Sequence, residues 1–214
     1  MQIAQYSELQ AAFNALVQKL EQKEALLYDA YRMQQQQTAR KESLEALEAD
    51  FSGFYQCVKE VLVARDKQAL RGIEGAVAEL IQVPTEYTKA IETALGAAAQ
   101  HIVTTDEQAA QQAIAYLKQK RAGRATFLPK TVMRSRKLQR AAIAHVLEHP
   151  AFIACADELL TASGDNQSII ENLLGNVIVA KHLEGATAIA RGCQYKYRVV
   201  TLDGDIVNAG GSLT

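Results

Sequence analysis

The segment HVLEH, residues 145–149, carries the clearest metal-binding pattern in the sequence. On a helix, His145 and His149 would share one face, where both imidazoles could bind zinc while Glu148 acts as a general base. Pro150 follows directly and ends such a helix, and no later pattern supplies a third ligand. A metal-dependent hydrolase is therefore the less favoured alternative, which a stoichiometric zinc content after purification would revive.

The other polar motifs do not form a catalytic centre. The sequence contains no Walker-type phosphate loop, and GIEG at residues 72–75 is too short for a dinucleotide fingerprint. Ser163 and Ser212 lie near glycines but outside a nucleophile-elbow pattern. Asp203 and Asp205 flank Gly204, and an Asp-Gly pair between two strands predicts a hairpin turn before it predicts a pair of acids. We expect no catalytic residue, no metal site and no cofactor in this chain.

Basic residues are strongly segregated along the chain. Residues 108–147 contain no acidic residue, and 148–191 contain six acidic residues against Lys181 and Arg191. The first stretch has nine basic residues: Lys118, Lys120, Arg121, Arg124, Lys130, Arg134, Arg136, Lys137 and Arg140. This separation predicts a surface for a polyanion, with nucleic-acid phosphate as the first candidate. The alternatives are a solvated face that balances the acidic stretch, or a contact with that stretch in another subunit.

The strongest DNA-binding candidates are Lys118, Lys120, Arg121 and Arg124, at the end of a predicted helix and in the turn after it. Phe127 is the only aromatic residue between Lys118 and Arg140, so base stacking is poorly supplied. We therefore expect binding to the phosphate backbone that is independent of sequence and sensitive to salt.

The composition is typical of a globular protein: 49% of the 214 residues are hydrophobic and 22% are charged. The three cysteines, at 57, 155 and 193, have no paired spacing, which favours free thiols in a reducing cytosol. No apolar run approaches the roughly 20 residues that span a bilayer. We expect no membrane association.

The first sixty residues predict one strand of a coiled coil. Apolar residues alternate at spacings of three and four from Tyr6 to Leu62, with polar interruptions at Gln34, Gln37 and Lys41. The alternative is one amphipathic helix packed on its own domain. A coiled-coil seam needs a partner, and no second heptad segment occurs here, so the partner is either another molecule or sequence beyond Thr214.

The remaining residues predict a duplicated α/β unit. Residues 91–128 and 170–202 both read as a helix ending at Leu-Gly, a strand, a second helix, a turn and another strand. Gly96 and Gly175 are predicted left-handed helix caps, and Thr105 with Gln108 a capping box. The strands expected are 101–104, 125–128, 177–180, 197–202 and 205–208. The alternative is a chance similarity of two generic α/β pieces.

These features together resemble the hinge of the SMC chromosome-organising ATPases, in particular their bacterial chromosome-partition branch. The matching stretches are GIEGAVAELI, YTKAIETALGAAAQHIV, GRATFLP, ENLLGNVIV and VTLDGDIVNAGGSLT, which span residues 72–214. The resemblance implies a mixed α/β (α+β) fold with two pseudo-symmetric subdomains after a coiled-coil helix. The domains expected are an arm at 1–65, hinge subdomain I at 66–148 and hinge subdomain II at 149–214.

The resemblance also implies a ring-like homodimer of hinges, DNA binding, and an antiparallel coiled-coil strand from the missing C-terminal half. ATP and Mg belong only to the distant heads of the full-length family, so this chain is expected not to be an enzyme. The location implied is the cytoplasm, associated with the nucleoid. The chain would be cut inside a longer protein.

Gly210 and Gly211 match the family's first pair of interface glycines. Glycine lets two backbones approach closely and adopts positive φ, and an unpaired edge strand invites a strand from a second chain. The dimer-interface residues expected are Asp205, Ile206, Val207, Asn208, Gly210 and Gly211, with the strand 205–208 or its neighbour near the two-fold seam. The alternative for the glycine pair is a flexible exit linker.

Overall fold

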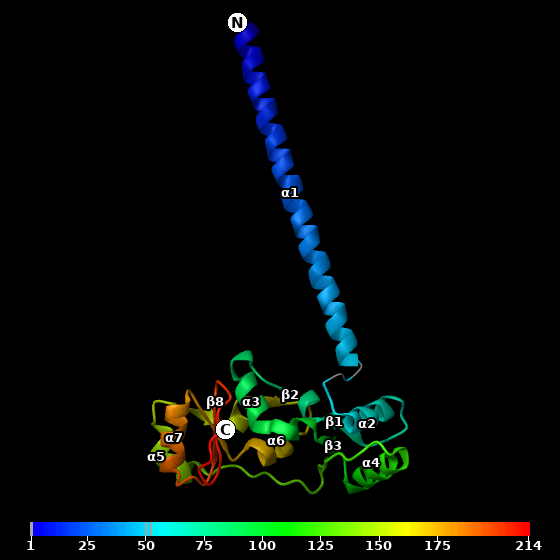
Figure 1. The fold of residues 1–214 in the computed structure, drawn as a ribbon, viewed down its shortest axis with the longest axis vertical. Coiled ribbons are helices and arrows are strands. Elements are labelled where there is room, and N and C mark those ends of the chain that lie inside the picture. The colour runs from blue at the N-terminus through cyan, green and yellow to red at the C-terminus, as the bar shows by residue number, and fades with distance from the viewer. Residues whose placement is uncertain (1, 50, 52) are drawn as a thin grey trace. The chain divides into compact units, whose positions relative to one another are not determined.

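The computed structural model describes residues 2–49, 51 and 53–214, which form two compact units, Met1–Gly53 and Phe54–Thr214. The first unit is a single helix, α1 (Gln2–Ala49), blue in Figure 1. It contains no glycine or proline and is rich in strong helix formers. Its apolar stripe is open: the exposed fractions are 74% for Leu9, 66% for Phe13 and 72% for Leu16. Such a stripe is stable in water only when another surface covers it.

The heptad pattern continues past the end of this helix. Phe51 has a positive φ of 51°, and a second helix, α2 (Gln56–Asp66), belongs to the second unit. Val58 and Leu62 are buried there, at 2% and 0% exposed. The prediction of a seam through Leu62 is wrong, because the three-four spacing also describes the core-facing side of a short globular helix. The boundaries predicted at residues 65 and 148 stay predictions.

The second unit repeats one order of elements. The first half contains β1 (Ile73–Ala76), η1 (Val77–Glu79), β2 (Ile81–Gln82), η2 (Thr85–Tyr87), α3 (Thr88–Leu95), η3 (Gly96–Gln100), β3 (Ile102–Thr104), α4 (Glu107–Lys120) and β4 (Phe127–Pro129). The second half contains η4 (Arg140–Ile143), α5 (Ala144–Leu147), β5 (Phe152–Cys155), η5 (Ala156–Glu158), β6 (Thr161–Ala162), α6 (Gln167–Leu174), β7 (Val177–Ala180), α7 (Leu183–Gly192), β8 (Arg198–Thr201) and β9 (Ile206–Val207).

The sheets confirm the predicted duplication and extend it. One sheet has the order β1-β3-β4 and the other β5-β7-β8-β9, and β2 pairs with β6. In both larger sheets the first two strands are antiparallel and the next pair is parallel. The first pair even carries a register shift at the same place, between Ile73 and Gly75 and between Phe152 and Ala154. The repeat therefore begins at β1 and β5, before the stretches that the sequence comparison aligned.

Several local predictions need correction. The cap of α4 is Asp106, whose carboxylate accepts a hydrogen bond from the Ala109 amide at 2.8 Å, and not Thr105. Neither Gly96 nor Gly175 is a left-handed cap: Gly96 has a positive φ of 49° but a ψ of −127°, and Gly175 has a φ of −65°. The predicted strands all lie within one or two residues of β3, β4, β7, β8 and β9. β1, β2, β5 and β6 were missed; β1 contains Gly75, a residue type depleted in strands, and β2 and β6 have only two residues each.

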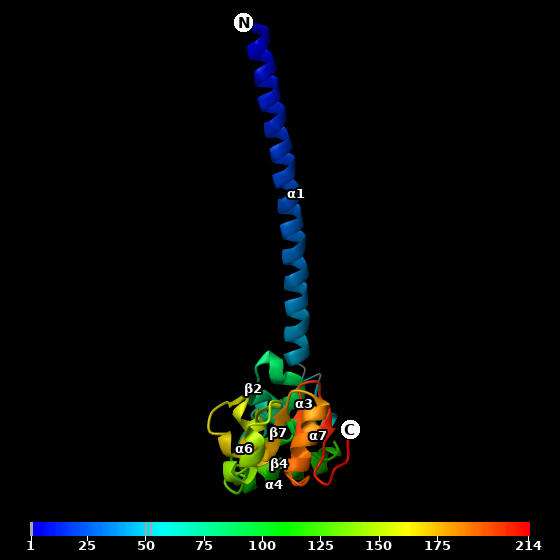
Figure 2. The same ribbon diagram turned by 90° about the vertical axis from the view of Figure 1, so that its left-hand side faces the viewer.

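The helices cover the sheets at both ends and in the middle of the second unit. Figure 1 shows α2 and α4 at one end and α5 and α7 at the other, with α3 and α6 between them; Figure 2 views the same unit end-on. One buried cluster joins the halves through residues such as Ile91, Val103, Ile170 and Val179. A second cluster lies under α5 and α7. The halves therefore fold around a shared core.

Candidate dimer and nucleic-acid interfaces

The predicted interface strand is β9, which lies inside a hairpin of its own chain. It pairs with β8 on one side. On its other side, Ile206 and Thr214 exchange backbone hydrogen bonds of 2.9 and 3.0 Å, and Val207 bridges Leu213. The strand at 205–208 is therefore not itself an unpaired edge, because the chain folds back over it, and the neighbouring segment is the one that stays open. The outer edge belongs to the neighbouring residues 212–214, where Leu213 is 60% exposed.

Gly210 and Gly211 form the turn of this hairpin. Their φ angles are 89° and 95°, which disfavour any residue with a side chain. The Gly210 amide donates to the Tyr195 carbonyl at 2.9 Å, and a Cβ on Gly211 would lie 3.5 Å from the Tyr195 ring. A Cβ on Gly210 would meet nothing within 4 Å. The glycines are thus required by the turn's backbone, and the space outside Gly210 is open to another molecule.

The other half of the unit presents a second open edge. β4 pairs with β3, and no described strand lies on its far side. Beside it is a groove of about 450 Å³, lined by Ile114, Leu117, Ala125 and Phe127 together with Lys118 and Arg124. Ile114 is 39% exposed. An apolar groove next to an unpaired strand can accept a strand whose side chains enter the groove.

The four predicted DNA-binding residues gather at the C-terminal end of α4. Arg121 caps this helix in a left-handed conformation with a φ of 52°, and the Lys120 ammonium lies 5.9 Å from the centre of the Tyr116 ring. The side chains of Lys118, Lys120, Arg121 and Arg124 are exposed, and no described acidic residue forms an ion pair with them. The turn that carries Arg124 is held by the Cys57 thiol, which donates to the Arg124 carbonyl at 3.0 Å.

Three of the nine basic residues form ion pairs with carboxylates of the same unit. The Lys130 ammonium lies 2.9 Å from Glu74, the Lys137 ammonium lies 3.3 Å from both Asp157 and Glu171, and Arg140 pairs with Glu158 at 2.7 Å. These pairs join the basic stretch to carboxylates elsewhere in the unit. The alternative in which the block balances the acidic stretch is therefore supported for Lys137 and Arg140, whereas Lys130 pairs with a carboxylate outside that stretch. The other six basic residues stay the candidates for phosphate binding.

Residues 70–190, more than half of the chain, match the family model described as the SMC proteins flexible hinge domain. The chain belongs to the SMC hinge family. The chromosome partition protein Smc of Bacillus subtilis is 47% identical over 213 residues, which cover all of this chain and 18% of that protein. The chain thus corresponds to less than a fifth of the length of this relative.

Solved hinges have the same fold. The SMC hinge domain of Geobacillus stearothermophilus, described as an asymmetric dimer, is 52% identical with a TM-score of 0.82, covering 91% of this chain and 79% of that one. The SMC hinge domain of Pyrococcus furiosus is 27% identical with a TM-score of 0.62, covering 82% and 87%. These similarities confirm the mixed α/β hinge fold after a long helix.

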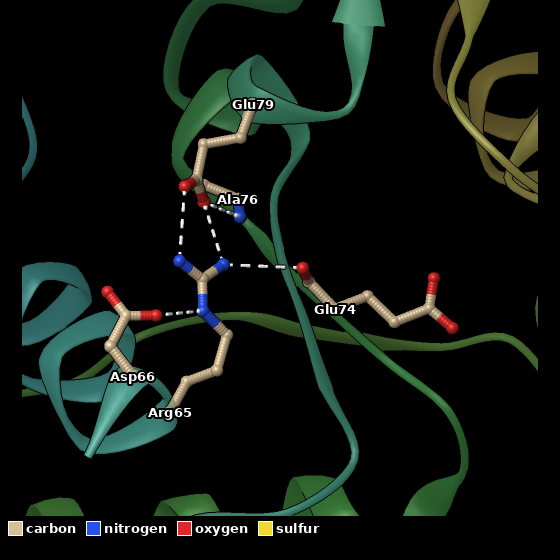
Figure 3. Close-up of polar contacts among 5 residues, drawn as sticks. All are labelled: Arg65, Asp66, Glu74, Ala76 and Glu79. Carbon is tan, nitrogen blue, oxygen red and sulfur yellow. Dashed lines mark hydrogen bonds and ion pairs between the residues drawn. The ribbon is translucent and has the colours of Figure 1, made fainter. Parts of the chain in front are cut away.

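Sequence reasoning missed an ion-pair cluster that fixes the start of this hinge (Figure 3). Arg65, at the end of α2, pairs with Asp66 at 2.8 Å and with Glu79 at 3.4 Å, and donates to the Glu74 carbonyl at 3.3 Å. Glu79 also accepts from the Ala76 amide at 2.8 Å. Burial acts to lower the pKa of Arg65, but the bonds to Asp66 and Glu79 outweigh it and raise that pKa. No spacing rule in the sequence connects these residues.

The HVLEH segment of the hinge has no metal-site geometry. His145 Nε2 lies 2.8 Å from the Gly192 carbonyl, and His149 Nδ1 accepts from the Ala151 amide at 3.2 Å. α5 ends at Leu147, so the two histidines do not share a helix. Within the described part of the chain, no group of three or more His, Cys, Asp or Glu side chains could hold a metal ion.

None of the described helices is apolar enough over its length to cross a bilayer.

Proposed function

We propose that this hinge dimerises and thereby joins two arms of an SMC chromosome partition protein. The observation that carries this proposal is the unequal strand count of its two related sheets. The second sheet has β9 and the 212–214 edge beyond β8, whereas the first sheet stops at β4. A second copy can supply the missing strand to β4, and the same exchange in the other direction closes a ring with two seams.

The side chains at these edges are complementary. Leu213 is an exposed apolar residue on the open 212–214 edge, and the groove beside β4 is lined by the apolar side chains of Ile114, Leu117, Ala125 and Phe127, with Lys118 and Arg124 also in its lining. If Leu213 of each copy inserts into the groove of the other copy, the Leu213 side chain and the apolar lining of the groove are both removed from water. The solved relative that is described as an asymmetric dimer supports association through this fold.

The same proposal gives a role to the long helix α1 and places ATP binding outside this chain. The exposed stripe of α1 fits an antiparallel coiled-coil strand from the C-terminal half of the longer protein. ATP and Mg would bind only at the heads of that protein, in the cytoplasm at the nucleoid. The hinge itself would contribute architecture and no catalysis.

We further propose that Lys118, Lys120, Arg121 and Arg124 bind DNA through its phosphates. Exposed cations that form no ion pair with a described acidic residue, gathered at one helix end, favour this role. Binding that weakens steeply with salt is expected; protein partners captured without any affinity for DNA would instead favour a coiled-coil adaptor.

Sedimentation equilibrium at several concentrations tests the dimer. We expect a mass near twice the 23.4 kDa of the chain. Leu213→Glu should raise the dimer dissociation constant roughly thirtyfold or more, since a central apolar anchor contributes about 2 kcal/mol. Leu183→Glu is the matched control, because Leu183 is 40% exposed on α7 and lies on neither edge. Equal dimerisation of both variants would contradict the proposed seam.

Glycine variants are a less direct test. A bulkier residue at Gly210 or Gly211 should also convert dimer to monomer, but it strains the left-handed turn as well. A variant that stays dimeric at micromolar concentration would remove the glycine turn from the interface.

A further inference from the structure

The connection between the two halves crosses the hinge as an irregular strap, defined here as residues 133–139. It runs from the turn after β4 to η4, and it carries Arg134, Arg136 and Lys137. Met133 packs against the shared core at its start. The strap therefore contains three of the five basic residues that remain in the basic stretch once the four at the α4 end are set aside.

The strap is fixed to the end of α6 through its backbone. The Arg136 amide donates to the Glu171 carbonyl at 3.4 Å, and the Leu138 amide donates to the Gly175 carbonyl at 2.7 Å. The Asn172 side chain donates to the Arg134 carbonyl at 2.6 Å. A Cβ on Gly175 would lie 3.1 Å from both the Arg136 carbonyl oxygen and the Lys137 Cα. A glycine at this position thus permits direct contact between the helix end and the strap.

Lys137 links the strap to two carboxylates of the second half through ion pairs. Its ammonium lies 3.3 Å from Asp157 and 3.3 Å from Glu171, and the Asp157 side chain is 1% exposed. No hydrogen-bond donor of the described residues otherwise meets the Asp157 oxygens. Hydrogen bonds to Asp157 and then Glu171 raise the pKa of Lys137, so the amine stays charged. A buried carboxylate with this single cation ties the strap strongly to the core.

Arg134 and Arg136 are exposed, and neither forms an ion pair with a described residue. We propose that the strap is a second phosphate-contacting surface for DNA, in which Arg134 and Arg136 bind the backbone while Lys137 keeps the strap in place. This inference rests on the proposed DNA binding of the hinge. Guanidinium groups bind phosphate oxygens in a bidentate manner, and a backbone that is already ordered loses little entropy on binding.

DNA is the ligand favoured by the surrounding sequence. No aromatic residue occurs between Leu128 and Ala151, so the strap offers no platform for bases. Contacts would be to phosphates alone, on double-stranded DNA of any sequence. The strap would add to the contacts at the α4 end and lengthen the binding site.

Fluorescence anisotropy with a labelled random-sequence duplex, measured over a series of KCl concentrations, tests the proposal. Arg134→Ala with Arg136→Ala should reduce the magnitude of the log affinity against log salt slope by about 1.8, since each phosphate contact contributes roughly 0.9. Lys181→Ala with Arg191→Ala removes the same charge from exposed sites off the strap and should leave the slope unchanged.

The outcomes separate this inference from the proposed function. If the unmodified hinge binds and the strap variant keeps the full slope, the strap surface is overturned while DNA binding stands. An equal decrease of the salt slope in both double variants would also overturn the strap surface, because the decrease would then reflect the net charge of the protein and not a contact at the strap. If the unmodified hinge does not bind the duplex, the proposed DNA-binding function fails and the strap surface fails with it.

A second variant tests the role of strap order. Lys137→Met with Asp157→Ala keeps the net charge and removes the inner ion pair. The Arg136 and Leu138 amides should exchange with solvent at least about tenfold faster, and DNA affinity should fall about two- to tenfold because the arginines must then be ordered on binding. Unchanged affinity together with faster exchange would overturn the role of Lys137.

Discussion

The two halves of the hinge have the same element order, but only the second is crossed by the strap. In both halves a glutamate just after the first strand accepts a backbone amide: Glu79 from Ala76 at 2.8 Å, and Glu158 from Cys155 at 3.3 Å. Each glutamate also pairs with an arginine from a preceding helix. These shared contacts fix which residues correspond.

By this correspondence Ala78 of the first half is the counterpart of Asp157. Ala78 is exposed, whereas Asp157 is buried beside Lys137. A charged residue therefore occupies the interior position and a small apolar one the open position. The difference teaches that the buried carboxylate belongs to the connection that passes over it, and not to the repeated unit.

The largest effect is expected from breaking the strap's ion pair. Lys137→Met should lower the free energy of unfolding by about 2–3 kcal/mol, because Asp157 is left buried without its cation. Adding Asp157→Ala, which copies Ala78 of the first half, should restore stability to within about 1 kcal/mol of the original. Urea denaturation of the three proteins measures both steps. If Lys137→Met alone is as stable as the original protein, water readily supplies the hydrogen bonds that the Asp157 carboxylate needs.

Substitution of the two helix-ending glycines, Gly96 and Gly175, by alanine should destabilise the hinge for different reasons. Gly175→Ala should cost about 1–3 kcal/mol, because the methyl group meets the backbone of the strap and of α6. Gly96→Ala should cost about 1–2 kcal/mol, because only its φ of 49° opposes a side chain and the space around it is open. The added methyl group of Gly175→Ala should displace the strap and speed hydrogen exchange of the Leu138 amide, whereas Gly96→Ala should leave that exchange rate unchanged. Equal exchange in both variants would argue against a close strap contact.

The two glutamate-arginine pairs offer a smaller contrast. The Arg65 side chain is 23% exposed with several partners, and the Arg140 side chain is 70% exposed. Arg65→Met should therefore destabilise the hinge by about 1–2 kcal/mol, and Arg140→Met should have a smaller effect because its ion pair is exposed to solvent. Thermal unfolding of the two variants at equal ionic strength makes the measurement. A larger loss for Arg140→Met would reverse the ranking by burial.

The smallest effect concerns pH. Ala76 pairs with Ile102 and Cys155 with Ile178, so His101 is the counterpart of Val177. Burial lowers the pKa of His101 in the folded hinge. The unfolded chain then binds the proton more tightly, so stability should decline as the pH falls below about 6.5. His101→Val should remove a few tenths of a kcal/mol of that decline; an identical pH profile would show that His101 does not contribute.

Much of the hinge was predictable from local patterns. The long helix, the Leu-Gly helix ends and the hydrophobic strands β7 and β8 follow from helix propensity and short apolar runs. The glycine pair predicted a special backbone at residues 210 and 211, and its φ angles confirm that requirement. The SMC hinge motifs also predicted the family that the comparisons show.

The sequence by itself determined the long helix, the strands β3, β4, β7, β8 and β9 to within two residues, the positive φ at Gly210 and Gly211, and how strongly charge is segregated. It could not assign Val58 and Leu62 to a core, since a heptad seam and a buried helix face have the same spacing. Nor could it separate Lys137, which pairs with residues 20 and 34 positions away, from the exposed Arg134 and Arg136. Only the tertiary structure decided these points, because burial and ion pairing depend on which distant segments meet, and local spacing carries no record of that.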